Sequence, residues 1–390
     1  MPRTVWVLGW VSLCMDTSSE LIHSLLPIFI TVTLGASATT LGLLEGVAES
    51  LAMVVKVFSG RLSDRLGRRM PLILAGYGLA TLVKPLFPLA QSLTLVAAAR
   101  WIDRIGKGIR GAPRDALIAD ATPPGMRGAA FGLRQSMDTL GAVLGPLLAI
   151  GLMWALDGYI RAVLWLAVIP GIVAVWLIFR YVKDVPTPTG PPTSAPVPTL
   201  RLPAIRSLPA PFWHLAALAM VLTLPRISEA FLILHAVQMG VAYAAAPWVL
   251  VCLSLAYALV AYPAGKLSDR IPRMRMVTLG MFVLVIANAL LASAHGFVHI
   301  LVGVALWGMH LGLTQGVLAS CIADTVPAAQ RGTGFGVFNL VLGVSVLLAS
   351  IGAGLIWDHY GPQAVFTIAG LIALIGMLWA SVAKNHAALE

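Results

Sequence analysis

Long apolar runs separated by short polar connections make up almost the whole chain. Each run is about 20 residues or longer, and about 20 apolar residues in a helix cross the roughly 30 Å hydrocarbon core of a bilayer. The pattern therefore predicts twelve membrane-spanning helices, with short connections between most of them. The predicted helices cover residues 4–33, 41–64, 71–90, 93–120, 128–155, 160–181, 211–235, 243–268, 276–294, 297–323, 332–356 and 362–383.

The pattern changes between the sixth and seventh predicted helices. This segment contains the stretch VPTPTGPPTSAPVPTL and is rich in proline and polar residues. Such a composition favours a partly extended linker over a packed element. We therefore expect three parts: an N-terminal six-helix bundle at 1–183, a cytoplasmic linker at 184–210 and a C-terminal six-helix bundle at 211–390.

The two halves of the chain repeat one another. Residues 118–132 (IADATPPGMRGAAFG) match residues 322–336 (IADTVPAAQRGTGFG), which lie 204 positions later. Residues 60–69 (GRLSDRLGRR) match residues 265–274 (GKLSDRIPRM), which lie 205 positions later. Two matches with nearly the same offset indicate a duplicated six-helix unit. Transporters that work by alternating access are commonly built from such repeats.

Composition and charge support a polytopic membrane protein. The chain is 59% hydrophobic and has a mean hydropathy of +0.90, which is far above the range of soluble domains. The net charge is +10, but the basic residues lie between apolar runs, so we do not expect nucleic-acid binding. Among the arginines that lie in connections between predicted helices, most follow an even-numbered helix. The positive-inside rule then predicts a multi-pass inner-membrane protein with both termini in the cytoplasm.

The stretch GRLSDRLGRR resembles the signature of the major facilitator superfamily, and the resemblance extends over nearly the whole chain. It implies an all-α membrane protein with twelve transmembrane helices in two pseudo-symmetric six-helix bundles. It also implies a conformational latch of charged residues that must open as the transporter changes state. By this resemblance the latch residues are Gly60, Asp64, Arg65 and Arg68, with Asp269 and Arg270 in the second repeat.

The fifth predicted helix reads G-x8-G-x3-G-P, which resembles a motif of family members that work as antiporters or exporters. Glycines at this spacing let helices pack closely, and a proline bends the helix. The resemblance therefore implies exchange rather than uptake. The motif residues are Gly132, Gly141, Gly145 and Pro146.

Residues 100–115 (RWIDRIGKGIRGAPRD) carry seven charged side chains in sixteen positions. In a helix most of these charges fall within an arc of about 120°. Each charge would cost about 2.5–3.5 kcal/mol in the centre of the lipid, so the stripe faces protein, water or substrate. An excess of cations there favours an anionic or zwitterionic substrate, although pairing within the bundle is an alternative role. The substrate-binding candidates are Arg100, Arg104, Lys107, His23, Arg226, Glu229, His310 and Gln315.

Acidic residues inside the predicted helices are the candidates for proton coupling. The affinity of a carboxylate for protons changes with its hydration and with nearby cations, which is the property that coupling requires. Asp16 and Glu20 on the first helix and Asp138 on the fifth meet this condition.

The sequence favours a proton-coupled antiporter that exports small organic, anionic or amphiphilic, solutes. No H-E-x-x-H, G-x-S-x-G or Walker A pattern is present, so we expect neither an enzyme nor a cofactor. The expected partners are a small-molecule substrate, protons and the lipid bilayer, and the expected state is a monomer. Two alternatives remain: divalent-metal or metal-chelate efflux, with Asp16, Glu20 and His23 as ligands, and proton-coupled uptake by symport.

Overall fold

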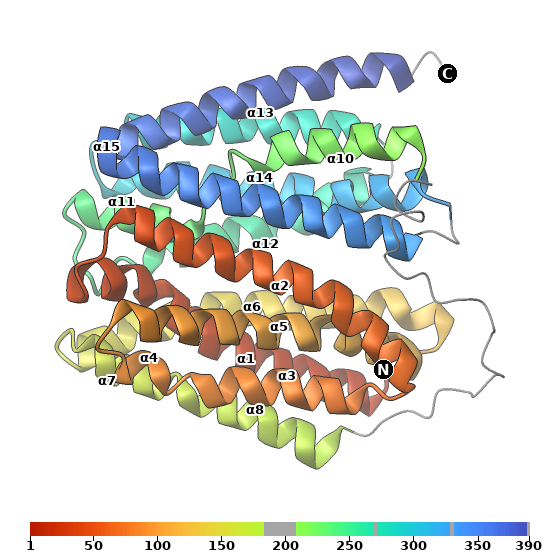
Figure 1. Cartoon of the computed structure of the whole chain (residues 1–390), viewed down its shortest axis with the longest axis horizontal. Coiled ribbons are helices and arrows are strands. Elements are labelled where there is room, and N and C mark those ends of the chain that lie inside the picture. Colours follow the sequence, from red (N-terminus) through yellow and green to blue (C-terminus); the bar gives the residue numbers. More distant parts are fainter. Residues whose placement is uncertain (183–207, 269–270, 328–330, 388–390) are drawn as a thin grey trace. The chain divides into compact units, whose positions relative to one another are not determined.

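The computed structural model describes residues 1–182, 208–268, 271–327 and 331–387, and these residues form helices and connections without any strand (Figure 1). The helices of the first half are α1 (Arg3–Ile28) with the π-helical turn η1 (Phe29–Thr33), α2 (Ala38–Leu66), α3 (Met70–Val83), α4 (Leu86–Leu89), α5 (Leu93–Ala121), the short turn η2 (Pro124–Met126), α6 (Arg127–Ala155), α7 (Ile160–Leu166) and α8 (Val168–Tyr181). Those of the second half are α10 (Ala210–Thr223), α11 (Glu229–Gln238), α12 (Trp248–Ser268), α13 (Arg273–Ala292), α14 (Phe297–Thr325) and α15 (Arg331–Ala387).

These helices confirm the twelve predicted spans. Three spans are each formed by two consecutive helices: α3 with α4, α7 with α8, and α10 with α11. In contrast, α15 contains two spans. Its 57 residues would extend about 86 Å as a straight helix, which is far longer than the roughly 30 Å hydrocarbon core of a bilayer. Gly361 divides them, since its φ of +83° lies in the left-handed region that favours glycine. Seven helices in the described ranges are long and apolar enough to cross a membrane.

The described residues form two compact units. Among the described residues, unit 1 contains 1–36, 47–182 and 242–251, and unit 2 contains 37–46, 208–241, 252–268, 271–327 and 331–387. Most of the predicted linker at 184–210 lies outside the described residues. The division into 1–183, 184–210 and 211–390 therefore stays a prediction.

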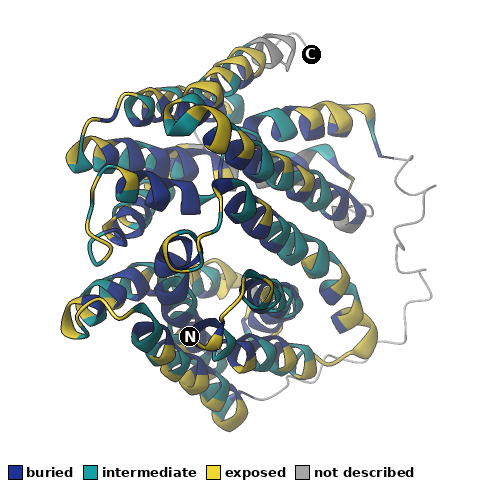
Figure 2. Cartoon of the chain, turned by 60° about the vertical axis from the view of Figure 1, so that its left-hand side comes forward, coloured by how far each residue is buried: buried dark blue, intermediate teal, exposed yellow. Residues whose placement is uncertain are grey.

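In unit 1, α1 lies against α6 and α8, and α3 lies against α5. The core between them is apolar, with Leu8, Val11 and Met15 of α1 close to Ile73 and Tyr77 of α3. Figure 2 shows buried residues on the sides of helices that face their neighbours and exposed residues on the outward sides. Many of the outward residues are large and apolar, as expected for helices that contact lipid.

In unit 2, the first turns of α2 pack closely against α15. The backbone N–H groups of Ala38 and Thr39 donate to the two carboxylate oxygens of Asp358, at 3.0 and 2.8 Å. Asp358 thus caps the start of a helix that lies 320 positions earlier in the chain. A Cβ atom at Gly42 would lie 2.1 Å from the carbonyl oxygen of Ser350, so only glycine fits there.

Candidate functional site

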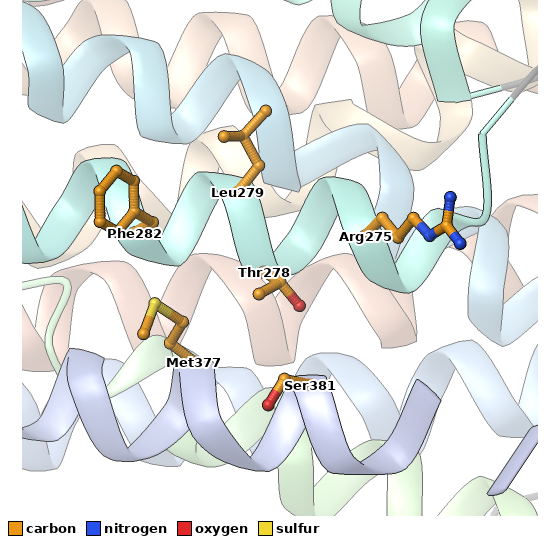
Figure 3. Close-up of a pocket in the computed structure, with 6 residues that line it drawn as sticks. All are labelled: Arg275, Thr278, Leu279, Phe282, Met377 and Ser381. Atoms are coloured by element: carbon orange, nitrogen blue, oxygen red, sulfur yellow. The ribbon is translucent and has the colours of Figure 1, made fainter. Parts of the chain in front are cut away.

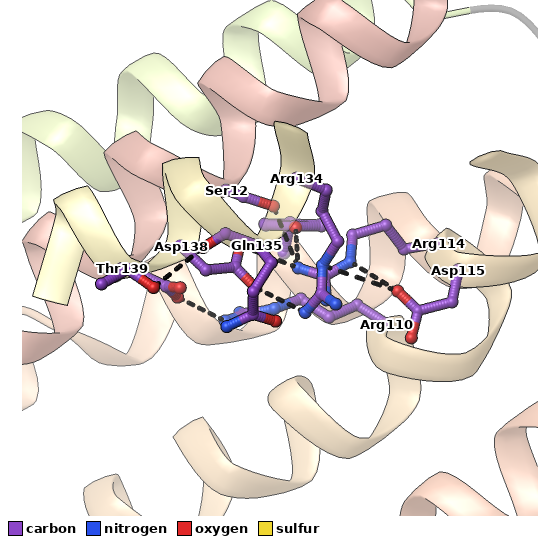
Figure 4. Close-up of polar contacts among 10 residues, drawn as sticks. Ser12, Arg110, Arg114, Asp115, Arg134, Gln135, Asp138 and Thr139 are labelled. Carbon is purple, nitrogen blue, oxygen red and sulfur yellow. Dashed lines mark hydrogen bonds and ion pairs between the residues drawn. The ribbon is translucent and has the colours of Figure 1, made fainter. Parts of the chain in front are cut away.

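A cluster of three arginines and three aspartates lies in unit 1, where α1, α5 and α6 meet (Figure 4). We call it the acid–arginine cluster. Because its positive and negative charges are equal in number, it is neutral when every member is ionised. Its members are Asp16, Arg110, Arg114, Asp115, Arg134 and Asp138.

Arg114 and Arg134 each contact the same two aspartates. Arg114 Nη1 lies 3.7 Å from Asp138 Oδ1, and its Nε lies 3.3 Å from Asp115 Oδ1. Arg134 Nη2 donates to Asp138 Oδ2, and its Nε lies 3.7 Å from Asp115 Oδ1. The two aspartates and two arginines therefore form a closed square of opposite charges. A change in the charge of any one of them acts on the other three.

Neighbouring polar and aromatic side chains hold the arginines in place. Arg114 Nη1 donates to Ser12 Oγ at 3.0 Å and to Tyr77 Oη at 3.4 Å. The Arg110 guanidinium lies 4.4 Å from the centre of the Tyr77 ring, a cation–π contact, and its Nη2 is 4.0 Å from Asp16 Oδ1.

One oxygen of the cluster is incompletely paired. Asp138 Oδ1 is buried and accepts no hydrogen bond from the described residues. A buried acceptor without a hydrogen bond is costly, and protonation converts a carboxylate oxygen into a donor. Asp138 Oδ1 therefore interacts with Arg114 through charge alone, at 3.7 Å, whereas Oδ2 accepts a hydrogen bond from Arg134.

The glycines of the fifth-helix motif bring α6 against α1 beside two of the predicted proton-coupling residues. A Cβ atom at Gly141 would lie 2.8 Å from the carbonyl oxygen of Leu13 and 3.0 Å from Asp16 Cβ. One at Gly145 would lie 2.8 Å from Glu20 Cβ. Close approach of α1 to α6 therefore requires glycine at both positions.

The two other motif residues make different contributions. Pro146 is buried within α6. Gly132 has no atom within 4 Å of where its Cβ would be, so this glycine serves no packing contact among the described residues.

Gly141→Val is expected to separate α1 from α6 and to lower the free energy of unfolding by about 1–3 kcal/mol, the usual cost of overpacking. The midpoint of thermal unfolding of the purified protein measures this effect. The matched control is Gly151→Val on the same helix, where a Cβ atom meets nothing within 4 Å. Equal midpoints for the two variants would show that the α1–α6 contact does not depend on Gly141.

Glu20 and Asp16 have different partners. Glu20 Oε2 lies 3.3 Å from Nδ1 of His23, one turn further along α1, whereas Asp16 faces Arg110 in the cluster. Among the described residues, no three His, Cys, Asp or Glu side chains are grouped so that they could hold a metal ion. The alternative set of metal ligands, Asp16, Glu20 and His23, stays a prediction.

The first part of the α5 stripe pairs with α2. Arg104 Nε lies 3.2 Å from Glu49 Oε1, and Arg100 Nη2 lies 3.8 Å from the same oxygen. Both arginine side chains are only 2% exposed, so the charge of Glu49 offsets theirs inside the protein. Lys107, in contrast, is exposed. The stripe is therefore divided into a paired part and an accessible cation.

Arg226 of unit 2 lies in the break between α10 and α11, beside Pro225, which cannot continue a helix in the usual way. Its Nε donates to His310 Nε2 at 2.9 Å, and its Nη2 donates to Thr314 Oγ1 at 2.5 Å. His310 Nδ1 in turn lies 2.8 Å from the carbonyl oxygen of Gly280. Since Nε2 accepts and Nδ1 donates, His310 is neutral in this arrangement.

Arg226 differs from the cluster arginines in its lack of a negative partner. No carboxylate in the described ranges forms an ion pair with it, and its side chain is only partly buried. Its two hydrogen-bond partners, His310 and Thr314, are neutral. A fixed guanidinium of this kind is suited to bind a carboxylate or phosphate group.

Of the remaining substrate-binding candidates, Glu229 is the first residue of α11, and Gln315 is an exposed residue of α14. Both stay predictions.

The latch candidates of the first repeat lie at the end of α2. Asp64 pairs with Arg69, whose Nε also lies 3.4 Å from Asp120 Oδ2 at the end of α5. Partial burial lowers the pKa of Arg69, but the hydrogen bonds and charges of Asp64 and Asp120 raise it above its usual value. This network links the ends of α2 and α5 within unit 1.

The remaining latch candidates of the first repeat lie on the same stretch of chain, at positions 60, 65 and 68. Arg65 and Arg68 are exposed, and a Cβ atom at Gly60 would lie 3.2 Å from Ala112 Cβ. Asp269 and Arg270 lie outside the described residues. All the latch assignments stay predictions.

Several charged residues outside the predicted site set also form buried or partly buried polar contacts. Glu49, Asp115, Arg134 and Arg69 are partners of predicted residues. Lys84 is fully buried and donates to Ser19 Oγ at 3.0 Å. Each is a charged residue in or beside an apolar run, and this is the sequence feature that could have identified it as part of a site. The identity of its partner depends on helix packing.

Comparison with known proteins agrees with the fold, which is that of a polytopic membrane protein. The sequence model of the Major Facilitator Superfamily matches residues 8–242 and 227–388. The chain belongs to this family, and the predicted family resemblance is confirmed. It is a membrane transporter of small-molecule substrates.

Two relatives and one solved structure show the range of similarity. The uncharacterized MFS-type transporter MJ1317 of Methanocaldococcus jannaschii is 29% identical over 97% of this chain and 94% of its own length. The multidrug resistance protein MdtH of Yersinia enterocolitica is 23% identical over 89% of this chain and 86% of its own length. The crystal structure of the nucleoside transporter NupG (D323A mutant) aligns with a TM-score of 0.82 at 12% identity, covering 97% of this chain and 99% of NupG.

Proposed function

We propose that the protein is a proton-coupled antiporter of the inner membrane that exports small organic anions by alternating access, with both termini in the cytoplasm. The observation that carries the proposal is the acid–arginine cluster, in which Asp138 has a buried oxygen without a hydrogen bond. A neutral cluster with one poorly satisfied acceptor is suited to gain and lose a single proton. The similarity to a multidrug resistance protein supports export.

The anion and the proton have separate binding groups in this proposal. The anion binds Arg226 of unit 2, and the proton binds Asp138 of unit 1, with Asp16 and Glu20 as further proton-coupling residues. When the anion is bound and every aspartate of the acid–arginine cluster is ionised, the Arg226 site and the cluster are each neutral. When the anion has left and the cluster holds the proton, the Arg226 site and the cluster each carry one positive charge.

The membrane potential then favours the exchange. The return step carries positive charge inward, and each elementary charge that crosses 100 mV gains about 2.3 kcal/mol. A negative interior therefore drives the transporter back to the state that loads substrate. We expect export to accelerate with a more negative interior as well as with a more acidic exterior.

Symport of an anion with a proton is the second candidate function. Protonation of Asp138 leaves Arg114 and Arg134 with one carboxylate between them, and the net positive charge of the cluster then attracts an anion. In this case the anion and the proton bind together. The two candidates differ in the direction of proton flow.

The experiment uses purified protein in liposomes that contain a pH-sensitive dye. Organic anions, amphiphilic cations and divalent metal ions are added outside in turn, and protein-free liposomes are the control. We expect an organic anion that enters the vesicles to drive protons out. Protons that enter with the anion would indicate symport, and a response to metal ions alone would contradict both candidates.

A further inference from the structure

A groove runs along unit 2 between α13 and the second half of α15 (Figure 3). Its volume is about 370 Å³, and residues of both helices line it. The groove lies within unit 2 and shares no residue with the Arg226 site or the acid–arginine cluster. The lining residues are Arg275, Thr278, Leu279, Phe282, Met377 and Ser381.

The groove is charged at one end and apolar at the other. Figure 3 shows the Arg275 guanidinium at one end and the Phe282 ring at the opposite end. Arg275 is exposed and forms no ion pair with the residues that the structure describes. Leu279 and Phe282 are 46% and 49% exposed, so they offer apolar surface.

The hydroxyl groups in the groove are already engaged as donors. Thr278 Oγ1 donates to the carbonyl oxygen of Met274, and Ser381 Oγ donates to that of Leu378. They offer lone pairs but no free proton to a ligand. Arg275 is therefore the strongest donor in the groove, and it selects for a negatively charged group.

The position of the groove along the membrane span matches the two parts of a lipid. Arg275 is the third residue of α13, whose apolar span is Arg273–Ala292, so its charge lies where a span ends. Phe282 lies seven positions further on, or about 10 Å deeper along the helix. A cation at headgroup level above apolar residues is the arrangement that recognises an anionic phospholipid.

We propose that this groove binds an anionic phospholipid. The phosphate group pairs with Arg275, and an acyl chain lies against Leu279, Phe282 and Met377. The proposal does not depend on the proposed transport reaction, because the groove is separate from both of its sites.

Native mass spectrometry of the full-length protein in detergent tests this assignment. Phosphatidylglycerol and phosphatidylcholine with identical acyl chains are titrated separately. One arginine near the membrane surface contributes about 1 kcal/mol to the attraction of an anionic lipid, so we expect about five-fold tighter binding of phosphatidylglycerol. Arg275→Gln should abolish that preference.

Two further variants separate the charged and apolar parts of the site. Phe282→Ala should weaken binding of both lipids while it retains the preference for phosphatidylglycerol. Arg180→Gln is the matched control, because Arg180 is an exposed arginine in the last turn of α8 and is not part of the groove. Equal preferences in the wild type and in Arg275→Gln would overturn the proposal.

Discussion

Asp138→Asn is expected to abolish proton-driven transport while exchange of anion for anion, without a proton gradient, continues. The substitution removes one of three negative charges and the oxygen proposed to hold the proton. It leaves Arg114 and Arg134 with Asp115 as the shared carboxylate. Loss of one partner of a buried ion pair costs about 3–5 kcal/mol, so folding must be checked alongside transport.

The two transport modes are measured in the same liposome preparation, which separates coupling from folding. A protein that is misfolded loses both modes, whereas one that is uncoupled loses only the proton-driven mode. Thr139→Val is the matched control, because the hydroxyl of this neighbouring residue donates to the carbonyl oxygen of Gln135. Wild-type pH dependence in Asp138→Asn would remove Asp138 from the mechanism.

Arg226→Gln is expected to raise the KM for the transported anion by about 10- to 100-fold, since a hydrogen bond to a charged group contributes about 1.5–3 kcal/mol. The maximal rate should change less, because the proton site in unit 1 is intact. Initial rates of uptake into liposomes, measured over a range of anion concentrations, separate the two parameters.

Two related variants sharpen the test of Arg226. Arg226→Lys retains the charge but not the planar fork, so its KM should lie between those of the wild type and Arg226→Gln. Thr314→Val removes one of the hydrogen bonds that position the guanidinium, and its effect should be smaller. A wild-type KM in Arg226→Gln would show that the anion binds elsewhere.

Much of the fold could be predicted from the apolar pattern, because a bilayer fixes the length of each span. The predicted helix at 41–64, for example, corresponds to α2 at Ala38–Leu66. The predicted helix at 211–235 is interrupted at residues 224–228, where Pro225 lies. A hydropathy pattern does not reveal this break, because the residues on both sides of it are apolar. Pro225 is the sequence feature that could have indicated it.

The site could be predicted only in part. The charged arc of α5 indicated that Arg110 and Arg114 avoid lipid, and both lie in the acid–arginine cluster. Their partners could not be predicted, because Asp16 and Asp138 come from helices whose positions depend on tertiary packing. The motif glycines predicted a close helix contact, but the spacing alone did not identify α1 as the neighbour or Asp16 as the residue beside Gly141.

Simultaneous recording of proton and anion movement tests the proposed exchange most directly. Liposomes that contain the wild-type protein, a pH-sensitive dye and a labelled organic anion are held at a fixed membrane potential. We predict that efflux of the anion is accompanied by proton entry, and that the two fluxes fall together in Asp138→Asn. Anion efflux without proton movement, or protons that leave with the anion, would contradict proton-coupled antiport.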